Sequence, residues 1–371
     1  MQITGIRLHD FRSYEHLALS AAPGLCVLVG ENAAGKTNVL EALFLCALGR
    51  SHRTRHDTEL IRHNQPGAFV GLTLHKRTGT HSIECRLYAD KRRELRIDDM
   101  ALSRSGELMG CLNVVMFSPE DLRLIKQGPV ERRRFLDMEL SQLQPAYYYR
   151  LQQYNIALRQ RNALLRTDRP SRALLEPWEE QLASLGAQLI LARASFMERL
   201  GGIAAALHSE LSGERETLRV LYKPAAESGD EAMLTQSLKA ALHDSAERDA
   251  LRGGTSVGPH RDDVLLELSG TDVRAYGSQG QQRTAALSLK LSEIALMREL
   301  GREPPVLLLD DVLSELDEDR QRMLAAAMQG CQTFLTCTQL AGLSAAGIKD
   351  MTVYRVHGGA VVPVKNGDTY Q

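Results

Sequence analysis

The chain has 371 residues, a length that indicates two or three domains rather than a single core. Its 45 basic and 46 acidic residues give a formal net charge of −1, which excludes a general electrostatic attraction to nucleic acid and leaves that role to local basic clusters. No apolar run approaches the roughly 20 residues that span a bilayer, and residues 1–8 lack the pattern of a signal peptide. We therefore expect a cytoplasmic protein with no membrane partner.

The first third of the chain is predicted to contain strands and one helix. Residues 25–29 form a short apolar run typical of a buried strand, and residues 36–49 show the apolar spacing of a helix. Residues 69–74, 83–87 and 94–97 alternate apolar and polar side chains. This alternation predicts an antiparallel subsheet.

The middle of the chain has a helical pattern. Residues 131–166 and 177–211 both show helical spacing, with a turn signal at 167–171 between them, and Pro145 is expected to break or kink the first helix. A helix of about 35 residues is about 50 Å long. We predict an antiparallel helical arm, with a third helix over 231–251 that ends at a glycine pair.

The last third returns to mixed character. Strands are predicted at 264–268, 306–309 and 333–336, and a helix rich in Ala and Leu at 284–300. The six cysteines have no metal-ligand spacing, so we interpret them as small buried residues of a reducing cytosol.

An octapeptide between the strand at 25–29 and the helix at 36–49 matches the pattern G-x-x-x-x-G-K-[ST]. Its residues are Gly30, Glu31, Asn32, Ala33, Ala34, Gly35, Lys36 and Thr37. The glycines let the backbone turn its N–H groups toward phosphates, and the helix N-terminus adds partial positive charge. We expect Lys36 to reach the β- and γ-phosphates of ATP, and Thr37 to ligate Mg²⁺.

Two acids follow the apolar run at 306–309. A carboxylate at the end of a buried strand lies beside phosphate-bound Mg²⁺ in P-loop proteins. We therefore predict Asp310 as the Mg²⁺ partner and Asp311 as the group that polarises the attacking water. The alternative, that both acids only cap a strand, is disfavoured by the phosphate loop.

The segment before the helix at 284–300 resembles the signature of ABC-type ATPases, which has Ser-Gly-Gly-Gln at this place. Its residues are Ser278, Gln279, Gly280, Gln281 and Gln282. In ABC proteins this segment meets the γ-phosphate of ATP held by the partner subunit, so the resemblance implies an ATP-dependent homodimer. The local alternative is a polar N-cap for the helix.

Ser314 and Asp317 resemble the D-loop that ABC heads use across their dimer. The alternative here is a capping segment for a helix near residues 318–328. The phosphate loop and the acid strand lie far apart in the sequence, which predicts an inserted domain between them.

The predicted fold class is α/β, a P-loop ABC-type ATPase head with a mixed sheet and an inserted, mainly helical arm. Residues 1–125 form the N-terminal part of the head, with the phosphate loop and the antiparallel subsheet. Residues 126–250 form the arm, and residues 251–371 form the C-terminal part of the head with the signature, the acid strand and the D-loop.

The motifs as a set resemble those of the RecF family of bacterial DNA replication and repair proteins, over essentially the whole chain. Besides the phosphate loop they are Phe-Arg-Ser-Tyr at 11–14, Phe-Ser-Pro-Glu-Asp-Leu at 117–122, Gly-Pro at 128–129 with Arg-Arg-Arg-Phe-Leu-Asp at 132–137, Gly-Pro-His-Arg-Asp-Asp at 258–263, Tyr-Gly-Ser-Gln-Gly-Gln-Gln-Arg at 276–283, Leu-Leu-Asp-Asp at 308–311 and Ser-Glu-Leu-Asp at 314–317.

The resemblance implies a function. RecF-like proteins bind ATP, dimerise head to head, and bind DNA near gaps and junctions between single strands and duplex. They act with RecO and RecR to help load the RecA recombinase, and they support replication restart and SOS induction. The chain has no His at 336–338, where most ABC ATPases place a switch histidine, so we expect slow hydrolysis. No Q-loop glutamine is assigned.

Local basic clusters are the candidates for DNA contacts, because Lys and Arg side chains neutralise phosphates. The candidate residues are Arg53, Arg55, Arg92, Arg93 and Arg132. The alternative for each is a solvated face or a local ion pair. For His260 we favour a structural or dimer-contact role over catalysis, and for the tyrosines at 147–149 we favour packing between arm helices over base stacking.

Three other classes of protein remain as alternatives. A transporter-type ABC subunit places its phosphate loop and acid strand closer together, and a P-loop small-molecule kinase does not need the segment at 278–282. A chromosome-maintenance head with a long coiled coil is disfavoured, because the helical middle is too short and interrupted.

Overall fold

The computed structural model describes residues 1–167, 171–226, 229–301, 303–340, 343, 348 and 350–364. The chain forms two compact units, Met1–Asp121 with Glu293–Gln371, and Leu122–Ser292. The domain bounds expected from the sequence remain a prediction. Within the described residues, no helix is both long enough and apolar enough to cross a bilayer.

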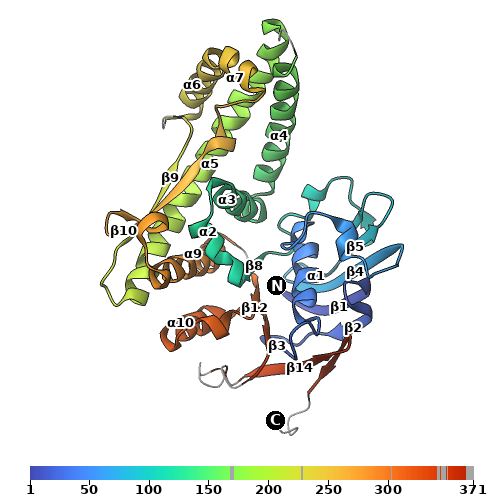
Figure 1. Cartoon of the computed structure of the whole chain (residues 1–371). Coiled ribbons are helices and arrows are strands. Elements are labelled where there is room, and N and C mark those ends of the chain that lie inside the picture. The colour runs from blue at the N-terminus through green and yellow to red at the C-terminus, as the bar shows by residue number, and fades with distance from the viewer. Residues whose placement is uncertain are drawn as a thin grey trace. The chain divides into compact units, whose positions relative to one another are not determined.

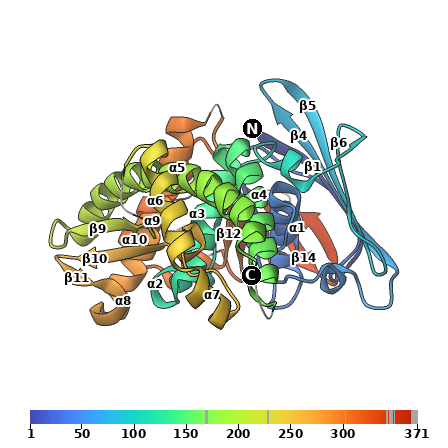
Figure 2. The same cartoon turned by 90° about the horizontal axis from the view of Figure 1, so that it is seen from above.

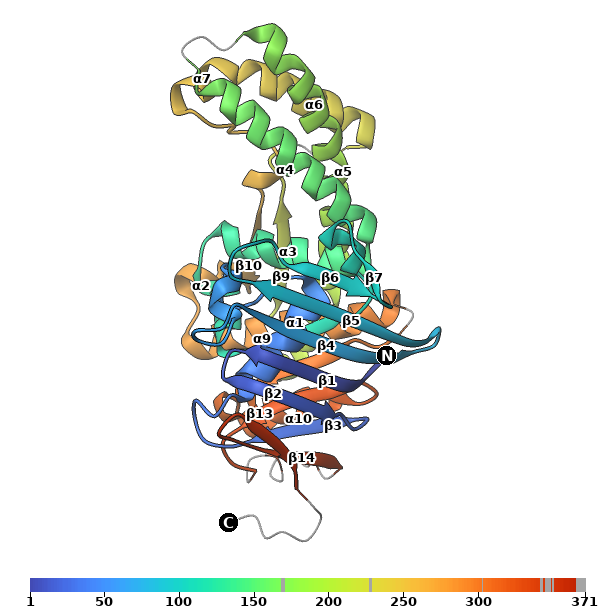
Figure 3. The same ribbon diagram turned by 90° about the vertical axis from the view of Figure 1, so that its right-hand side faces the viewer.

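The first unit contains an antiparallel sheet with the strand order β2-β1-β4-β5-β6-β7 (Figure 3). Its strands are β1 (Gln2–Phe11), β2 (Tyr14–Ser20), β4 (Gly67–Lys76), β5 (Gly79–Tyr88), β6 (Glu94–Ile97) and β7 (Met100–Ala101). Alternate residues of β1 are buried, as expected for a sheet with one face on a core. The predicted antiparallel subsheet is present, extended by the N-terminal hairpin β1–β2.

The second sheet of this unit has the order β15-β14-β3-β13-β12-β8. Its strands are β3 (Leu25–Val29), β8 (Val114–Phe117), β12 (Val306–Asp310), β13 (Thr333–Cys337), β14 (Met351–His357) and β15 (Ala360–Pro363). All neighbours are parallel except β14 and β15. The buried central strands are continuous apolar runs, because both faces of a parallel sheet are covered.

Helix α1 (Lys36–Leu48) contacts strands of both sheets, namely β4 and β5 of one and β8, β12 and β13 of the other. Figure 3 shows it behind the antiparallel sheet. Eleven of its 13 residues are buried, and the helix is apolar on nearly all sides. A helix without a polar face belongs in a core, so α1 forms the centre of this unit. Helix α10 (Glu318–Met328) lies between β12 and β13 in the sequence.

The second unit is built on long helices (Figure 1). The longer helices are α3 (Pro129–Leu143), α4 (Pro145–Leu165), α5 (Arg172–Ser212) and α6 (Glu231–Asp244), and the short ones are α2 (Arg123–Lys126), α7 (Ala246–Arg252) and α8 (Val273–Tyr276). Pro145 ends the first predicted helix and starts the next, as expected. Helix α5 starts before the predicted position and contains Pro177, and the helix predicted at 231–251 is interrupted at Ser245.

A three-stranded antiparallel sheet completes the second unit, in the order β11-β10-β9 (Figure 2). Its strands are β9 (Leu218–Lys223), β10 (Asp263–Leu268) and β11 (Thr271–Asp272). Strand β9 also packs on α5. Helix α9 (Gln279–Leu300) follows α8, and the boundary between the two units falls within it.

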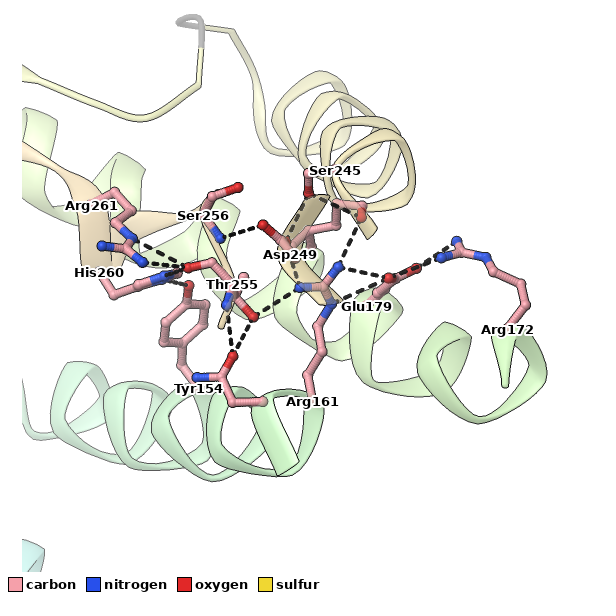
Figure 4. Close-up of polar contacts among 12 residues, drawn as sticks. Tyr154, Arg161, Arg172, Glu179, Ser245, Asp249, Thr255, Ser256, His260 and Arg261 are labelled. Atoms are coloured by element: carbon pink, nitrogen blue, oxygen red, sulfur yellow. Dashed lines mark hydrogen bonds and ion pairs between the residues drawn. The ribbon is translucent and has the colours of Figure 1, made fainter. Parts of the chain in front are cut away.

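Arg161 lies at the centre of the helical part of the second unit and is wholly buried (Figure 4). Its guanidinium forms ion pairs with Glu179 at 3.0 Å and Asp249 at 2.9 Å, and donates to the hydroxyl of Thr255 and the carbonyl of Leu242. These partners come from α5, α6, α7 and the loop after α7. A buried ion pair is stabilising only when its remaining donors are satisfied. Here acceptors from several elements satisfy the donors of the Arg161 guanidinium.

The segment at 258–263 links these helices to the small sheet. Asp262 accepts from Arg193 at 2.9 Å, and Asp263 accepts from Arg132 at 2.7 Å. His260 lies between Tyr154 and the carbonyl of Thr255, as Figure 4 shows. That carbonyl can only accept, so Nε2 carries the proton and Nδ1 accepts from Tyr154. The contacts agree with a structural interpretation of His260.

Candidate functional site

The carboxyl ends of β3, β12 and β13 meet at one edge of the parallel sheet, and a cavity of about 220 Å³ lies there. From the predicted phosphate loop, its lining includes Asn32, Ala33, Gly35, Lys36 and Thr37. The other lining residues are Asn38, Arg53, Asp310, Asp311 and Thr336. The structure therefore brings the loop and the two acids together.

Glycine is required at two positions of the loop. Gly35, at the N-terminus of α1, has φ 108°, and a Cβ there would lie 2.8 Å from Ser13 Oγ. A Cβ on Gly30 would lie 2.3 Å from the carbonyl oxygen of Val356. A larger residue at Gly30 would force the backbone of Val356 to move, and one at Gly35 would be strained by the positive φ and would clash with the Ser13 side chain. The loop is thus held tightly, with the N-terminus of α1 at the cavity.

Lys36 is buried, and its ammonium group holds the loop closed. Nζ donates to the carbonyl of Gly30 at 2.6 Å and to that of Glu31 at 2.8 Å. An ammonium has three N–H donors, so one remains for a ligand in the cavity. The carbonyls of Gly30 and Glu31 therefore position the ammonium group at the cavity, where it is expected to bind phosphate.

Asp310 connects the loop to the end of β12. Its Oδ1 accepts from the hydroxyl of Thr37 at 2.8 Å and from that of Thr336 at 2.8 Å. Thr336 Oγ1 in turn accepts from the backbone N–H of Asp311 at 3.0 Å. The threonine that stands near the expected switch-histidine position is therefore part of the site, as a hydrogen-bonding residue.

Asp311 adopts a left-handed backbone conformation with φ 52°. Such a conformation is uncommon for a residue with a Cβ, and it occurs preferentially at functional sites. It turns the chain at the end of β12, and the side chain of Asp311 lines the cavity. This geometry suits a carboxylate that acts on a molecule in the cavity.

The segment Phe-Arg-Ser-Tyr at 11–14 supports the loop from behind. Ser13 Oγ accepts from the Asn38 amide at 3.0 Å, and the hydroxyl of Tyr14 donates to the carbonyl of Gly35 at 3.0 Å. Burial raises the pKa of Tyr14, so the hydroxyl remains a donor. Sequence resemblance marked this segment without giving it a role, and the structure places it against the start of α1.

Glu41 of α1 is wholly buried and anchors two arginines. Arg12 donates two hydrogen bonds of 2.8 Å to its carboxylate, Ser51 donates one of 2.5 Å, and Arg53 lies 3.6 Å away. Burial alone would raise the pKa of Glu41, but the hydrogen bonds from Arg12 and Ser51 and the two positive charges hold that pKa below its ordinary value. Glu41 is therefore an ionised anchor.

Arg53 was predicted as a DNA contact, and this stays a prediction for a side chain that is 44% exposed. Its guanidinium lines the cavity and donates to Asn38 Oδ1 at 3.2 Å. A guanidinium there is also suited to a phosphate group of a small ligand. A local run of basic residues does not show which of its members faces a cavity.

Two further DNA candidates are held by internal contacts. Arg132 is buried, pairs with Asp263 and donates to the carbonyls of Leu124 and Gln127. Arg93 pairs with Asp57 at 2.8 Å and donates to the carbonyl of Gly49. These contacts give both side chains a structural role, and their assignment as DNA candidates stays a prediction. Arg55 and Arg92 are exposed and remain predictions.

The segment Ser278–Gln282 starts α9 and forms a reciprocal N-cap. The N–H of Gln281 donates to Ser278 Oγ at 3.3 Å, and Gln281 Oε1 accepts from the N–H of Ser278 at 2.7 Å. Ser278, Gln279 and Gly280 are exposed. The capping role considered from the sequence is present, and the contact with a partner's nucleotide stays a prediction.

The predicted D-loop also has a local capping role. Asp317 accepts from the N–H of Arg320 at 3.0 Å and begins α10, while Ser314 Oγ donates to the carbonyl of Asp311 at 2.8 Å. Ser314 and Asp317 are exposed. Their role across a dimer stays a prediction.

The site contains residues that the motifs did not identify, namely Asn38, Glu41 and Thr336. Thr336 is the last residue of the strand predicted at 333–336, and parallel strands place their carboxyl ends together, so a signal for it existed. For Glu41 the signal was a charged residue in an otherwise apolar helix, which requires a partner.

Comparison with known proteins agrees with this geometry. A family model described as the RecF/RecN/SMC N terminal domain matches residues 2–359. The Smc head domain of Pyrococcus furiosus, in a structure bound to the C-terminal domain of ScpA, is similar in fold, with a TM-score of 0.57 and 15% identity over 98% of this chain and 95% of that chain. The fold and the site define an ABC-type P-loop ATPase head with a helical insertion, and they confirm the predicted fold class.

The similarity to one branch of this class is much higher. The DNA replication and repair protein RecF of Alkaliphilus oremlandii is 42% identical over 97% of this chain and 100% of its own length, and that of Lachnoclostridium phytofermentans is 44% identical over 97% and 99%. A solved structure of the recombination mediator protein RecF-ATP in the RecFOR pathway has a TM-score of 0.92 and 34% identity, covering 98% of this chain and 99% of that chain. The chain belongs to the RecF family, which confirms the resemblance.

Proposed function

We propose that this chain is an ATP-dependent DNA-binding protein of recombinational repair and replication-fork maintenance. In this proposal two copies join head to head around ATP, clamp DNA near single-strand gaps or junctions, and help recombinase loading and SOS induction. Membership of the RecF family supports a role in repair and replication, because the relatives are named for DNA replication and repair. A cytoplasmic location belongs to the same proposal.

The phosphate cavity is the observation that carries the ATP-binding part. It combines a buried lysine, a helix N-terminus, a guanidinium and two carboxylates at the end of parallel strands. In the proposal Lys36 and Arg53 bind the β- and γ-phosphates, and the N–H groups of the loop at 30–37 surround them. The similar RecF-ATP structure supports the choice of this nucleotide.

The same residues fit Mg²⁺. Thr37 Oγ1 and Asp310 are hard oxygen donors, the type that this ion prefers, and they are already within 2.8 Å of one another. When bound, the ion would neutralise charge on the phosphate oxygens. In the proposal Asp310 holds the Thr37 hydroxyl in the orientation that such coordination requires.

Asp311 is proposed to accept a hydrogen bond from the attacking water and so to orient it. Its strained backbone and its place in the cavity support this role. Thr336 occupies the neighbouring strand end, and its hydroxyl is a poor base. We therefore expect weak, DNA-stimulated ATP hydrolysis, and the protein is primarily a DNA-binding switch.

The proposed dimer uses the exposed start of α9. The first N–H groups of a helix lack partners within it and attract anions. In the proposal Ser278–Gln282 of one copy meets the γ-phosphate held by the other, with Ser314 and Asp317 at the same interface. Proteins of the RecO and RecR type are the proposed repair partners, because the related structure is that of a RecFOR-pathway protein.

Mass measurement by light scattering, with and without ATP–Mg²⁺ at saturating nucleotide, tests the dimer. We expect the mass to double with ATP, and an unchanged mass would contradict the clamp. A titration of gapped, single-stranded and duplex DNA with and without ATP then tests the DNA-binding part. Equal affinity under both conditions would contradict the ATP switch.

A further inference from the structure

The side-chain amide of Gln281 determines how α9 begins. Its Oε1 accepts from the N–H of Ser278 at 2.7 Å, while its own backbone N–H donates to Ser278 Oγ at 3.3 Å. The two bonds close a ring at the first turn of α9. The Gln281 side chain therefore holds the backbone N–H of Ser278 at this turn, while the backbone N–H of Gln281 holds the Ser278 hydroxyl.

Glu216 fixes the orientation of the Gln281 amide. Its Oε1 accepts from Gln281 Nε2 at 2.8 Å. An ionised carboxylate only accepts hydrogen bonds, so the NH₂ end of the Gln281 amide must face Glu216 and the carbonyl end must face Ser278. With the amide reversed, neither hydrogen bond could form.

Glu216 is itself held by α5. Its Oε2 lies 3.2 Å from Nε2 of His208, which is wholly buried, and its carbonyl oxygen accepts from Ser212 Oγ at 3.5 Å. The Gln281 amide, followed by His208, holds the pKa of Glu216 below its ordinary value despite the opposing effect of burial. Glu216 thus remains an ionised acceptor at neutral pH, fixed to the end of α5.

We propose that Glu216 is a positioning residue for the segment Ser278–Gln282. By fixing the Gln281 amide, Glu216 holds the backbone of Ser278 and thereby places Ser278 and the exposed N-terminus of α9 toward the nucleotide held by a second copy of the chain. This inference rests on the proposed function, and it adds a residue that lies outside every motif in the sequence.

Two substitutions at this position separate its roles. Glu216→Ala removes the acceptor, whereas Glu216→Gln retains a carbonyl oxygen that can accept from Gln281. A hydrogen bond to a charged group corresponds to a change of about tenfold or more in an equilibrium constant. We expect the ATP-dependent dimer to be about tenfold weaker in Glu216→Ala, and Glu216→Gln to recover most of that difference. Glu214→Gln, at an exposed neighbour, is the matched control and should dimerise normally.

The affinity of the isolated subunit for a fluorescent ATP analogue provides a second readout. Because Glu216 acts on the segment that serves the other copy, this affinity should be the same in Glu216→Ala and in the unmutated chain. A parallel loss of nucleotide affinity and dimerisation would indicate a general structural role and would contradict the inference.

Mixing two defective variants tests whether Glu216 of one copy acts on the nucleotide site of the other copy. Lys36→Ala lacks a functional phosphate loop but has an intact segment at 278–282. Glu216→Ala has an intact phosphate loop but a disturbed segment at 278–282. A mixed dimer then contains one intact composite site. At a protein concentration where neither variant associates alone, we expect ATP-dependent association and ATP turnover to reappear on mixing. No recovery on mixing would overturn the inference.

The outcomes separate this inference from the function on which it rests. If the unmutated chain forms no dimer with ATP, the composite site of the proposed function fails, and the inference fails with it. If the unmutated chain dimerises and Glu216→Ala dimerises equally well, only the inference is wrong.

Discussion

The hydroxyl of Thr37 donates a hydrogen bond of 2.8 Å to Asp310 Oδ1, although 273 residues separate the two in the sequence. Thr336 donates to the same oxygen. One carboxylate oxygen is thus occupied by two hydroxyl groups that fix its direction. The proposed catalytic residues are held in place by the fold itself, and substitutions can test each part of that arrangement.

Lys36→Ala should weaken the binding of ATP by at least about tenfold. The ammonium group is the buried positive charge of the cavity, and removing a charge-assisted hydrogen bond to phosphate weakens binding by at least about tenfold. Titration with a fluorescent ATP analogue measures the change. Lys91→Ala, at an exposed lysine, is the control and should bind normally. Unchanged affinity in Lys36→Ala would refute the assignment of the phosphate loop.

Asp311→Asn should retain nucleotide but hydrolyse it more slowly. The amide has nearly the shape of the carboxylate, so the cavity is preserved, but it is a far weaker acceptor for the proton of a water molecule. General-base groups contribute about 10²-fold or more to rates. Single-turnover measurements of phosphate release, with DNA present, would show the effect. Equal turnover in this variant would reject the role of Asp311.

Glu41→Ala should destabilise the first unit by about 3 kcal/mol, because it leaves the guanidinium of Arg12 without its buried partner. Urea unfolding measures the change. Glu15→Ala, at an exposed carboxylate, is the matched control and should cost little. The sign of the pH dependence follows from the lowered pKa of Glu41. Its contribution is present above the pKa of the unfolded chain, about 4.3, and is lost as the pH falls through the lower pKa of the folded state.

His260 should make the second unit less stable in mild acid. Burial lowers the pKa of this imidazole to about 4, and nearby arginines act in the same direction, against the opposing effect of its bond to Thr255. As the pH falls below about 6.5, the imidazole binds a proton in the unfolded chain but stays neutral in the folded chain. The free energy of unfolding therefore decreases between about pH 6.5 and 4. In His260→Gln, denaturant unfolding should depend less on pH over this range. An identical slope in both proteins would contradict the neutral, buried state of His260.

Arg55 and Arg92 are exposed members of the predicted DNA-binding set that lie outside the cavity lining. Replacing each by Ala should weaken DNA binding and reduce the slope of log affinity against log salt by about 1 for each phosphate that is no longer neutralised. Arg132→Ala should instead lower the stability of the second unit, since it leaves Asp263 unpaired. A DNA-specific defect in Arg132→Ala with normal unfolding would reverse this assignment.

The parts of the fold that are local in sequence could be predicted. The strand at 25–29, the loop, the helix after it and the strand that ends at Asp310 each carry their own pattern. Pro145 marked a helix boundary because proline cannot continue the preceding hydrogen-bond ladder. Strands β8, β9, β14 and β15 were not predicted, since short segments without strict alternation give no periodic signal.

The functional assignment of the arginines could not be predicted in the same way. Arg53, Arg93 and Arg132 all stand in basic runs, yet one lines the cavity and two form internal ion pairs. Their partners lie in other parts of the chain, for example 131 residues away for Arg132 and Asp263. Local sequence records charge, whereas the burial that decides its use depends on tertiary packing.

The position of β3 has a consequence for synthesis. This strand lies near the amino terminus, but its neighbours on both sides, β13 and β14, come from near the carboxyl terminus. A ribosome-bound chain therefore carries the phosphate loop long before the two strands that flank β3 are made. Truncated products that end before β13 should be unable to retain nucleotide, so incomplete copies would not compete with finished ones for it.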